Sequence, residues 1–237
     1  MGVSEGSKAV EATRRMVKGC DGCSLRCEVK APVPMYGRKQ ARYLFIGEAP
    51  GATEDDTGIP FIGGAGKLLR RAVAKNGIHQ RDVAYTNVVH CRPPKNRTPR
   101  ASEVEACRHN LLAEMAVVEA TVVVLCGATA FNVFRPDLQI SHHHSTPMMI
   151  EDGRVAIGMI HPAAALRQKH FEKVIWSVVA QAKMRATKGL MIDWPDTCVL
   201  CGDEADEADT MGVFYCHKHR SRMESWRNMG SQMGLLV

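Results

Sequence analysis

Three residues with side chains suited to cleaving a polar bond each follow a short apolar run. Glu48 comes directly after LFIG, Asn87 closes VAYTN, and His161 closes VAIGMIH. A carboxylate can orient or activate water, and a histidine can donate a hydrogen bond where negative charge develops. An asparagine amide carries donors and an acceptor in one plane, as reading the edge of a base requires. Each residue alone also has a structural explanation, but together at predicted strand ends they indicate a site.

A loop unusually rich in glycine starts at the first of these residues. It reads GEAPGATEDDTGIPFIGGAG over residues 47–66. Such loops after strands often bind phosphate or merely form a turn, but neither GxGxxG nor GxxxxGK[ST] is present. Glu48 would also repel a phosphate held close to it. Phe61, between Pro60 and glycines, is either a core residue or a flat surface for a flat ligand.

The elements that position these residues alternate between strand and helix patterns. The strands are expected at 41–47, 83–89, 121–127 and 155–161, and the helices at 66–77, 102–120 and 171–186. Ser102 and Glu105 have the spacing of a capping box at the start of the second helix. The alternation predicts a three-layer αβα domain with a short, mainly parallel sheet, in which ligands bind at the carboxyl ends of the strands.

Composition limits the class of protein. The 237 residues are 45% hydrophobic and 24% charged, which is typical of a soluble globular chain with room for one domain and an appendage. The N-terminus lacks a secretory apolar core, and no run is long enough for a membrane span, so we expect a cytoplasmic protein without a membrane partner. The net charge of +6 favours an anionic partner.

A basic loop follows Asn87 and reads VVHCRPPKNRTPR. Its candidates for contact with nucleic acid are Arg92, Lys95 and Arg97. The alternative is a solvated loop without a ligand, which is the common fate of charge runs.

Two cysteine pairs, one of them closely spaced, could hold metal in the main domain. Cys20 and Cys23 form one pair, and Cys91 and Cys107 form the other. Nine cysteines without an export signal argue against a disulfide framework. Four thiolates suit zinc or a [4Fe–4S] cluster, and spacing alone does not choose between them.

The composition changes near Gly189, which predicts a main domain over residues 1–189 and a small module over residues 190–237. The module has an acidic run, a basic end and a possible zinc-ligand set, for which His217 is a competing fourth ligand. The set is Cys198, Cys201, Cys216 and His219. The alternative is a group of reduced cysteines without metal. A separate run, His142–His144, is expected to lie in a solvated surface loop.

Five motifs in order resemble the family 4, iron–sulfur, uracil-DNA glycosylases. They are CDGC, FIGEAPGATEDDTGIPFIGGAGKLL, TNVVHCRPPKNRTP, EACRHNL and IHPAAALR, spread over roughly residues 17–185. The resemblance implies that the four cysteines of the main domain bind a [4Fe–4S] cluster. It also implies an enzyme that excises uracil from DNA and leaves an abasic site.

The resemblance implies roles for the residues at the strand ends. Phe61 would stack on a flipped uracil, Asn87 would bind its polar edge, and His161 would donate to the uracil oxygen that gains charge. Glu48 would orient or activate water, or stabilise the cationic sugar. Related enzymes carry an aspartate at the position of Ala49, so activation here would rest on Glu48.

Further roles follow from the same resemblance. Gly47, Ala49 and Gly51 would let the backbone approach the base. Glu54 would fill the space that the methyl group of thymine needs. Leu166 would enter the vacated base stack, with Arg167 beside it on the DNA.

The leading hypothesis is therefore a monomeric DNA repair hydrolase. Its partner would be uracil-containing DNA, single- or double-stranded, and its tail would bind a protein partner that the sequence does not identify. The alternative is a catalytically weak homologue that binds uracil-containing or single-stranded DNA and works through its zinc tail.

Overall fold

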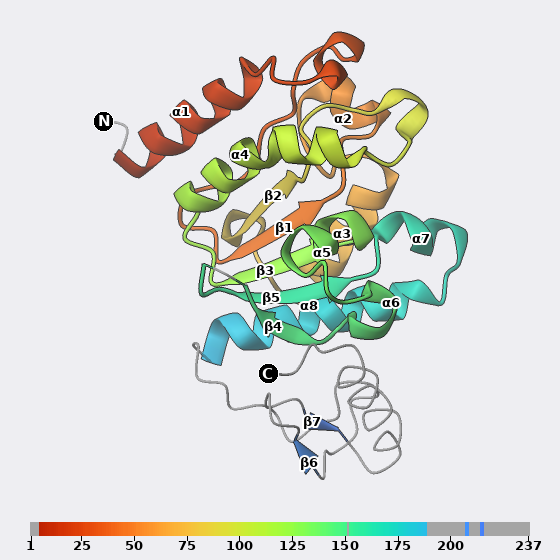
Figure 1. Cartoon of the computed structure of the whole chain (residues 1–237). Coiled ribbons are helices and arrows are strands. Elements are labelled where there is room, and N and C mark those ends of the chain that lie inside the picture. The colour runs from red at the N-terminus through yellow and green to blue at the C-terminus, as the bar shows by residue number, and fades with distance from the viewer. Residues whose placement is uncertain (1–4, 151, 189–206, 209–213, 216–237) are drawn as a thin grey trace. The chain divides into compact units, whose positions relative to one another are not determined.

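The computed structural model describes residues 5–150, 152–188, 207–208 and 214–215 (Figure 1). Contacts divide the chain into two units, Met1–Leu190 and Met191–Val237. In the second unit, β6 (Glu207–Ala208) pairs antiparallel with β7 (Phe214–Tyr215). The boundary predicted between residues 189 and 190 lies outside the described residues.

A five-stranded sheet forms the centre of the first unit, in the order β2-β1-β3-β5-β4. All neighbours are parallel except β4, which runs antiparallel to β5 at the edge. The strands are β1 (Tyr43–Gly47), β2 (Val83–Asn87), β3 (Val122–Cys126), β4 (Pro147–Met149) and β5 (Val155–Met159). Every residue of the four parallel strands is buried, as a sheet covered on both faces requires.

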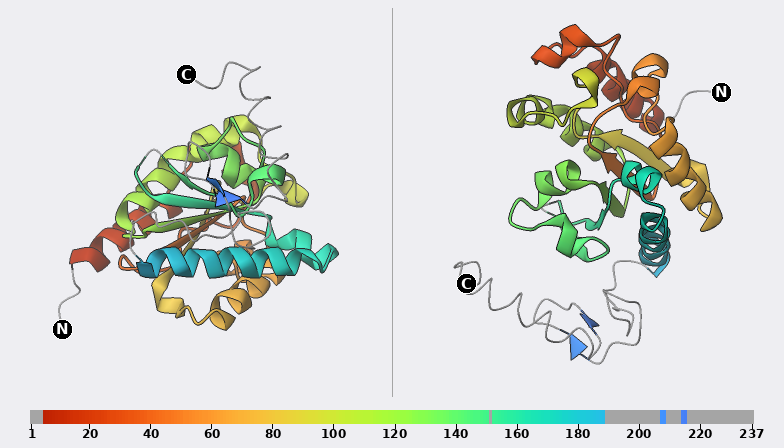
Figure 2. Two further views of the ribbon diagram at one scale, coloured as in Figure 1. Left: turned by 90° about the horizontal axis from the view of Figure 1, so that it is seen from below. Right: turned by 90° about the vertical axis from the view of Figure 1, so that its right-hand side faces the viewer.

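Helices cover both faces of this sheet (Figure 2), which confirms the predicted three-layer α/β architecture. Successive residues of β1 point to opposite faces. Leu44 and Ile46 therefore pack in one hydrophobic cluster and Tyr43 and Phe45 in the other. The first cluster includes residues of α1 (Glu5–Lys18), α4 (Ala101–Val117) and α5 (Ala128–Phe134). The second includes residues of α3 (Gly64–Lys75), α7 (Pro162–Arg167) and α8 (Phe171–Lys188).

Short helical segments complete the domain. They are α2 (Ala52–Thr57), α6 (Ile140–His143), η1 (Ser24–Glu28), η2 (Gln80–Asp82) and η3 (Pro94–Asn96). The expected loop at His142–His144 is therefore wrong in part, because two of its histidines end a helical turn. None of the helices in the described part of the chain has the length and apolarity to cross a membrane.

The start of α4 differs from the predicted capping box. The helix begins at Ala101, and the carboxylate that reaches back is that of Glu103, which accepts a hydrogen bond from Arg100 N at 2.7 Å. The Ser102–Glu105 pattern therefore lies two residues too late. Arg97 also pairs with Glu103 and so stabilises the observed start.

Candidate active site

The ends of β1 and β2 bring three predicted site residues together. Gly47 is in register with Asn87 across the strand pair. A methyl group on Gly47 would lie 2.5 Å from Asn87 Oδ1 and 2.7 Å from Phe61 Cζ. The glycine is therefore required by close approach, and the Asn87 amide and the Phe61 ring both border its Cα. Asn87 is buried, with 3% of its surface exposed.

Phe61 has features of a core residue and also features of a ring held in place for a flat ligand. The residue is buried, and its ring centroid lies 5.6 Å from that of Tyr85 in the core. Its backbone is left-handed, with φ of 55°, which is strained for a residue with a bulky side chain. Gly66 makes this turn possible, since a methyl group there would lie 2.0 Å from the Phe61 carbonyl carbon.

His161 is the N-cap of α7, directly after β5. Its Nδ1 accepts a hydrogen bond from Ala163 N at 3.2 Å. A backbone N–H can only donate, so Nδ1 is unprotonated and the proton of the neutral ring is on Nε2. Burial lowers the pKa of His161, and the positive charge of Arg167 lowers it further, against the opposing effect of Glu48. The site therefore holds a neutral imidazole with one N–H donor left over.

Glu48 is half-buried, and its Oε2 accepts a hydrogen bond from the hydroxyl of Thr129. Thr129 lies in the first turn of α5, just beyond the carboxyl end of β3. This residue was missed in the sequence, although its place two residues after the strand-terminal Gly127 was a usable signal. The hydroxyl fixes one carboxylate oxygen of Glu48 and leaves the other for a different partner.

The side-chain carboxylate of Glu54 closes the glycine loop by binding backbone N–H groups at both ends of the loop. Its carboxylate accepts hydrogen bonds from Gly51 N at 3.1 Å, Ile62 N at 2.9 Å and Gly63 N at 2.7 Å. These bonds join the start of the loop to its end. The predicted place of Glu54 against the methyl group of thymine stays a prediction. Ala49 is half-buried against the hydrophobic cluster that includes α4.

The residues predicted to contact DNA differ in how free their side chains are. Leu166 is 56% exposed, and Arg167 and Lys95 are also exposed. Arg92 Nε donates to Asn96 Oδ1 at 2.7 Å within the basic loop.

Arg97 is committed to a different contact. Its guanidinium donates two hydrogen bonds to the buried carboxylate of Glu103, at 2.8 and 2.6 Å. The hydrogen bonds from Arg97, helped by the backbone N–H of Arg100, lower the pKa of Glu103 to about 2, against burial, which raises it. This pair ties the basic loop to α4, so Arg97 orders the loop whether or not it also contacts DNA.

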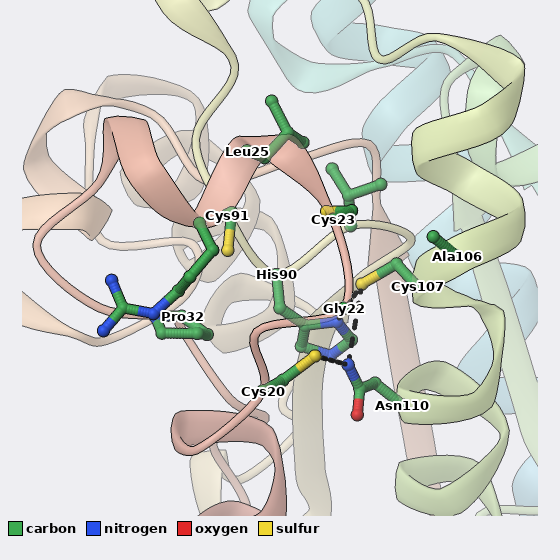
Figure 3. A pocket seen from close by; sticks show the side chains of 12 residues that line it. Cys20, Gly22, Cys23, Leu25, Pro32, His90, Cys91, Ala106, Cys107 and Asn110 are labelled. Carbon is green, nitrogen blue, oxygen red and sulfur yellow. Dashed lines mark hydrogen bonds between the residues drawn. The ribbon is translucent and has the colours of Figure 1, made fainter.

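The four cysteines of the main domain line one pocket (Figure 3). Cys20 and Cys23 come from the segment between α1 and η1, Cys91 from the loop after β2, and Cys107 from α4. Asn110 also lines the pocket and donates from Nδ2 to Cys20 Sγ at 3.2 Å. Segments distant in sequence therefore meet at this pocket.

Behind Cys107 lies a fully buried polar pair. His90 Nδ1 is 3.1 Å from Cys107 Sγ, and His90 Nε2 is 2.9 Å from Glu114 Oε2. Burial lowers the pKa of His90, but Glu114 and Cys107 together outweigh burial and raise the pKa to about 10. Burial raises the pKa of Cys107, but the hydrogen bond and charge of His90 outweigh that effect, so the net pKa is lowered. The imidazole of His90 therefore links the carboxylate of Glu114 to the sulfur of Cys107.

Burial raises the pKa of two other thiols at this pocket, those of Cys23 and Cys91. Burial, followed by the charges of Cys107, Cys23 and Cys20, raises the pKa of Cys91 to about 12. Across residues 5–150, 152–188, 207–208 and 214–215, no three His, Cys, Asp or Glu side chains form a group suited to a metal ion. Four thiols that line one pocket are donors suited to zinc or to a [4Fe–4S] cluster. The zinc ligands predicted in the tail, Cys198, Cys201, Cys216 and His219, lie outside the described residues.

Comparison with known proteins defines the class of this fold and site. The model of the uracil DNA glycosylase superfamily matches residues 34–182, so the chain belongs to that superfamily. The type-4 uracil-DNA glycosylase of Thermotoga maritima is 36% identical over 178 residues, which cover 73% of this chain and 93% of that protein. The type-4 enzyme of Archaeoglobus fulgidus is 37% identical over 167 residues, 64% of this chain and 80% of the relative. That of Pyrobaculum aerophilum is 41% identical over 118 residues, 50% of this chain and 60% of the relative. Within the superfamily, these similarities place the chain with type 4 and confirm the predicted resemblance.

Proposed function

We propose that this chain hydrolyses the N-glycosidic bond between uracil and deoxyribose in DNA and leaves an abasic site. One observation carries the proposal: a carboxylate, an amide and a neutral imidazole stand at the carboxyl ends of β1, β2 and β5 in a uracil-DNA glycosylase fold. This edge is where parallel α/β sheets bind ligands.

Recognition of the base is assigned to Asn87 and Phe61. The Asn87 amide, held against Gly47, presents donors and an acceptor to the polar edge of uracil. Cytosine has a donor where uracil has an acceptor. If the Asn87 amide is held in one orientation, it cannot hydrogen-bond to cytosine there, and buried polar groups are left unpaired. Each unpaired group costs about 1–3 kcal/mol. Phe61 supplies the flat surface on which the base stacks.

Departure of the base is assisted by His161. When the glycosidic bond breaks, its electron pair leaves with uracil, and the charge spreads to the uracil oxygens. The Nε2–H of a neutral His161 donates to the oxygen that gains charge, while Ala163 N holds the ring through Nδ1. Uracil leaves as an anion and takes its proton later from solvent.

Attack by water is directed by Glu48. Thr129 fixes one oxygen of the carboxylate, and the other accepts a hydrogen bond from the water. The water oxygen bonds to C1′ of the sugar, and its proton passes to Glu48 and on to solvent. The negative charge of the same carboxylate stabilises the cationic sugar before attack.

The DNA must give up the base from its stack, which costs a few kcal/mol. Contacts from the basic side chains Arg92, Lys95 and Arg167 to phosphate offset this cost. Leu166, the most exposed large apolar side chain of the described residues, fills the space left in the stack. Single-stranded DNA needs no unpairing and is a substrate on the same argument.

Cys20, Cys23, Cys91 and Cys107 would hold a [4Fe–4S] cluster; the similarity to type-4 enzymes and the meeting of the four thiols at one pocket support this assignment. Such a cluster, when bound, supplies a covalent cross-link among the segments that carry its ligands. The cysteines then hold the loop after Asn87 against α4 and the N-terminal segment. The spacing of the tail cysteines supports a separate zinc site there. We place the protein in the cytoplasm, as a monomer, where its DNA substrate is accessible.

The test is release of free uracil from oligonucleotides with one uracil, single- and double-stranded, against matched cytosine oligonucleotides. The proposal expects uracil and an abasic site from both uracil substrates and no base from the cytosine controls. Tight binding of uracil DNA without release of uracil would instead support a binding module.

A further inference from the structure

The side chain of Arg70 makes an unusual set of contacts with the turn that carries Phe61. Arg70 lies in α3, nine residues after Phe61, and is half-buried. Its Nε donates to the carbonyl oxygen of Phe61 at 2.8 Å, and its Nη2 donates to that of Pro60 at 3.2 Å. Two consecutive carbonyl groups therefore point at one guanidinium.

Aromatic rings hold the guanidinium in place. Its Cζ lies 4.2 Å from the centroid of the Tyr85 ring and 5.5 Å from that of Tyr36. Gln80 fixes the remaining side, since its Oε1 accepts from Arg70 Nη1 and from the Tyr85 hydroxyl, each at 3.2 Å. A planar cation that is stacked and hydrogen-bonded on three sides has little freedom to move.

The turn that Arg70 holds is itself strained. Phe61 has φ of 55°, a conformation that a residue with a bulky side chain adopts only when its surroundings impose it. The positive φ decides where the ring points, because it sets the direction of the Cα–Cβ bond relative to the loop. Charge-assisted hydrogen bonds to the carbonyl groups on both sides of Phe61 Cα stabilise this conformation.

We propose that Arg70 is a positioning residue that holds Phe61 in its left-handed turn, so that the ring stays against Gly47 and Asn87 where the base stacks. The inference rests on the proposed function for its link to uracil. Arg70 does not touch the base. It acts through the Phe61 backbone on one side and through the shared Tyr85 ring on the other.

The position of the ring can be measured without activity. The protein labelled with fluorophenylalanine has six phenylalanine signals, and the Phe61 signal is the one lost in Phe61→Ala. In Arg70→Met the Phe61 signal should shift or broaden. In Arg71→Met, a matched change at the next, exposed residue of the same helix, it should stay in place. An unmoved Phe61 signal in Arg70→Met overturns the inference, whether or not the protein excises uracil.

The consequence for the base is measured by inhibition with free uracil and by single-turnover excision. Loss of Phe61 should weaken both by roughly 5- to 150-fold, the range for base–aromatic stacking. Arg70→Met should lose at least about fivefold, and Arg70→Lys, which keeps the charge but not the planar fork, should lie between Arg70→Met and the wild type.

A double-mutant cycle separates action through Phe61 from general damage. If Arg70 acts through the ring, Arg70→Met in the Phe61→Ala background should cause no further loss. Additive losses overturn the inference. If Arg70→Met fails to fold, Arg70→Lys carries the same cycle and the same fluorine measurement. If the wild type neither binds nor releases uracil, the proposed function is overturned. If the Phe61 signal is nevertheless shifted in Arg70→Met, the positioning role stays supported.

Discussion

A single methyl group at Gly47 should disable the site, because the space beside this glycine is already occupied. In Gly47→Ala the new carbon would lie 2.5 Å from Asn87 Oδ1 and 2.7 Å from Phe61 Cζ. Ordinary contacts of such a carbon begin at 3.4 Å. The Asn87 amide or the Phe61 ring must therefore move by about 1 Å, and both belong to the proposed uracil site.

The magnitude follows from that displacement. A misplacement of about 1 Å costs on the order of 10²-fold in rate when the group positions a substrate. Overpacking of a buried position costs about 1–3 kcal/mol of stability, less than a typical domain has available. The variant should fold and bind DNA through its phosphate contacts, but excise uracil about 10²-fold more slowly.

The assay is single-turnover excision from a uracil oligonucleotide, with thermal unfolding of the same samples. Gly19→Ala is the matched control, because a methyl group there meets only carbonyl oxygens at 3.5 and 3.7 Å. It should excise at the wild-type rate. Wild-type excision by folded Gly47→Ala would refute the convergence of Gly47, Asn87 and Phe61 on one ligand.

Three more predictions follow from the same structure. Purified protein should be brown with about four irons per chain, and Cys91→Ser should lose the colour and stability, since metal binding is folding free energy here; stoichiometric zinc without iron after anaerobic preparation would contradict this. Truncation before Asp193 should remove about one zinc and leave the colour and excision intact; loss of excision would show that the tail completes the site. Excision should be constant above pH 6.5, the ordinary pKa of histidine, and fall as the pH drops through the lowered pKa of His161. The lowered pKa of His161 also stabilises the folded state above pH 6.5. This contribution is lost on acidification, because the unfolded chain takes up the proton at a higher pH than the folded protein does. An excision rate that rises toward low pH would contradict a neutral His161.

The layer order of this protein is readable from local patterns because the parallel strands are mostly short apolar runs, although β2 ends in Thr86 and Asn87. Strand β4 was missed, since Pro147–Met149 is a three-residue edge strand with no such run. Helix α2 was missed for a similar reason. Its ATEDDT sequence has no apolar stripe, and the turn is held by the carboxylate of Glu54.

The candidate site was predictable at the strand ends and not around them. Glu48, Asn87 and His161 carry chemistry that their types disclose. The group that holds Glu48 acts across a long sequence separation, so no local pattern announces it: Thr129 reaches Glu48 over 81 residues. His161 is held locally, by the backbone N–H of Ala163. The role of Arg70 has no local signal either, because the stacking of its guanidinium on Tyr85 depends on the fold.

The most direct test of the central claim is the single-turnover rate of uracil release by Glu48→Gln and His161→Ala beside the wild type. Each change should lower the rate by roughly 10²–10⁴, the range for positioned acid–base and oxyanion-stabilising groups. Affinity for uracil DNA should stay close to that of the wild type, because phosphate contacts dominate binding. Wild-type rates in both variants would contradict the claim that the carboxylate after β1 and the imidazole after β5 carry out the reaction.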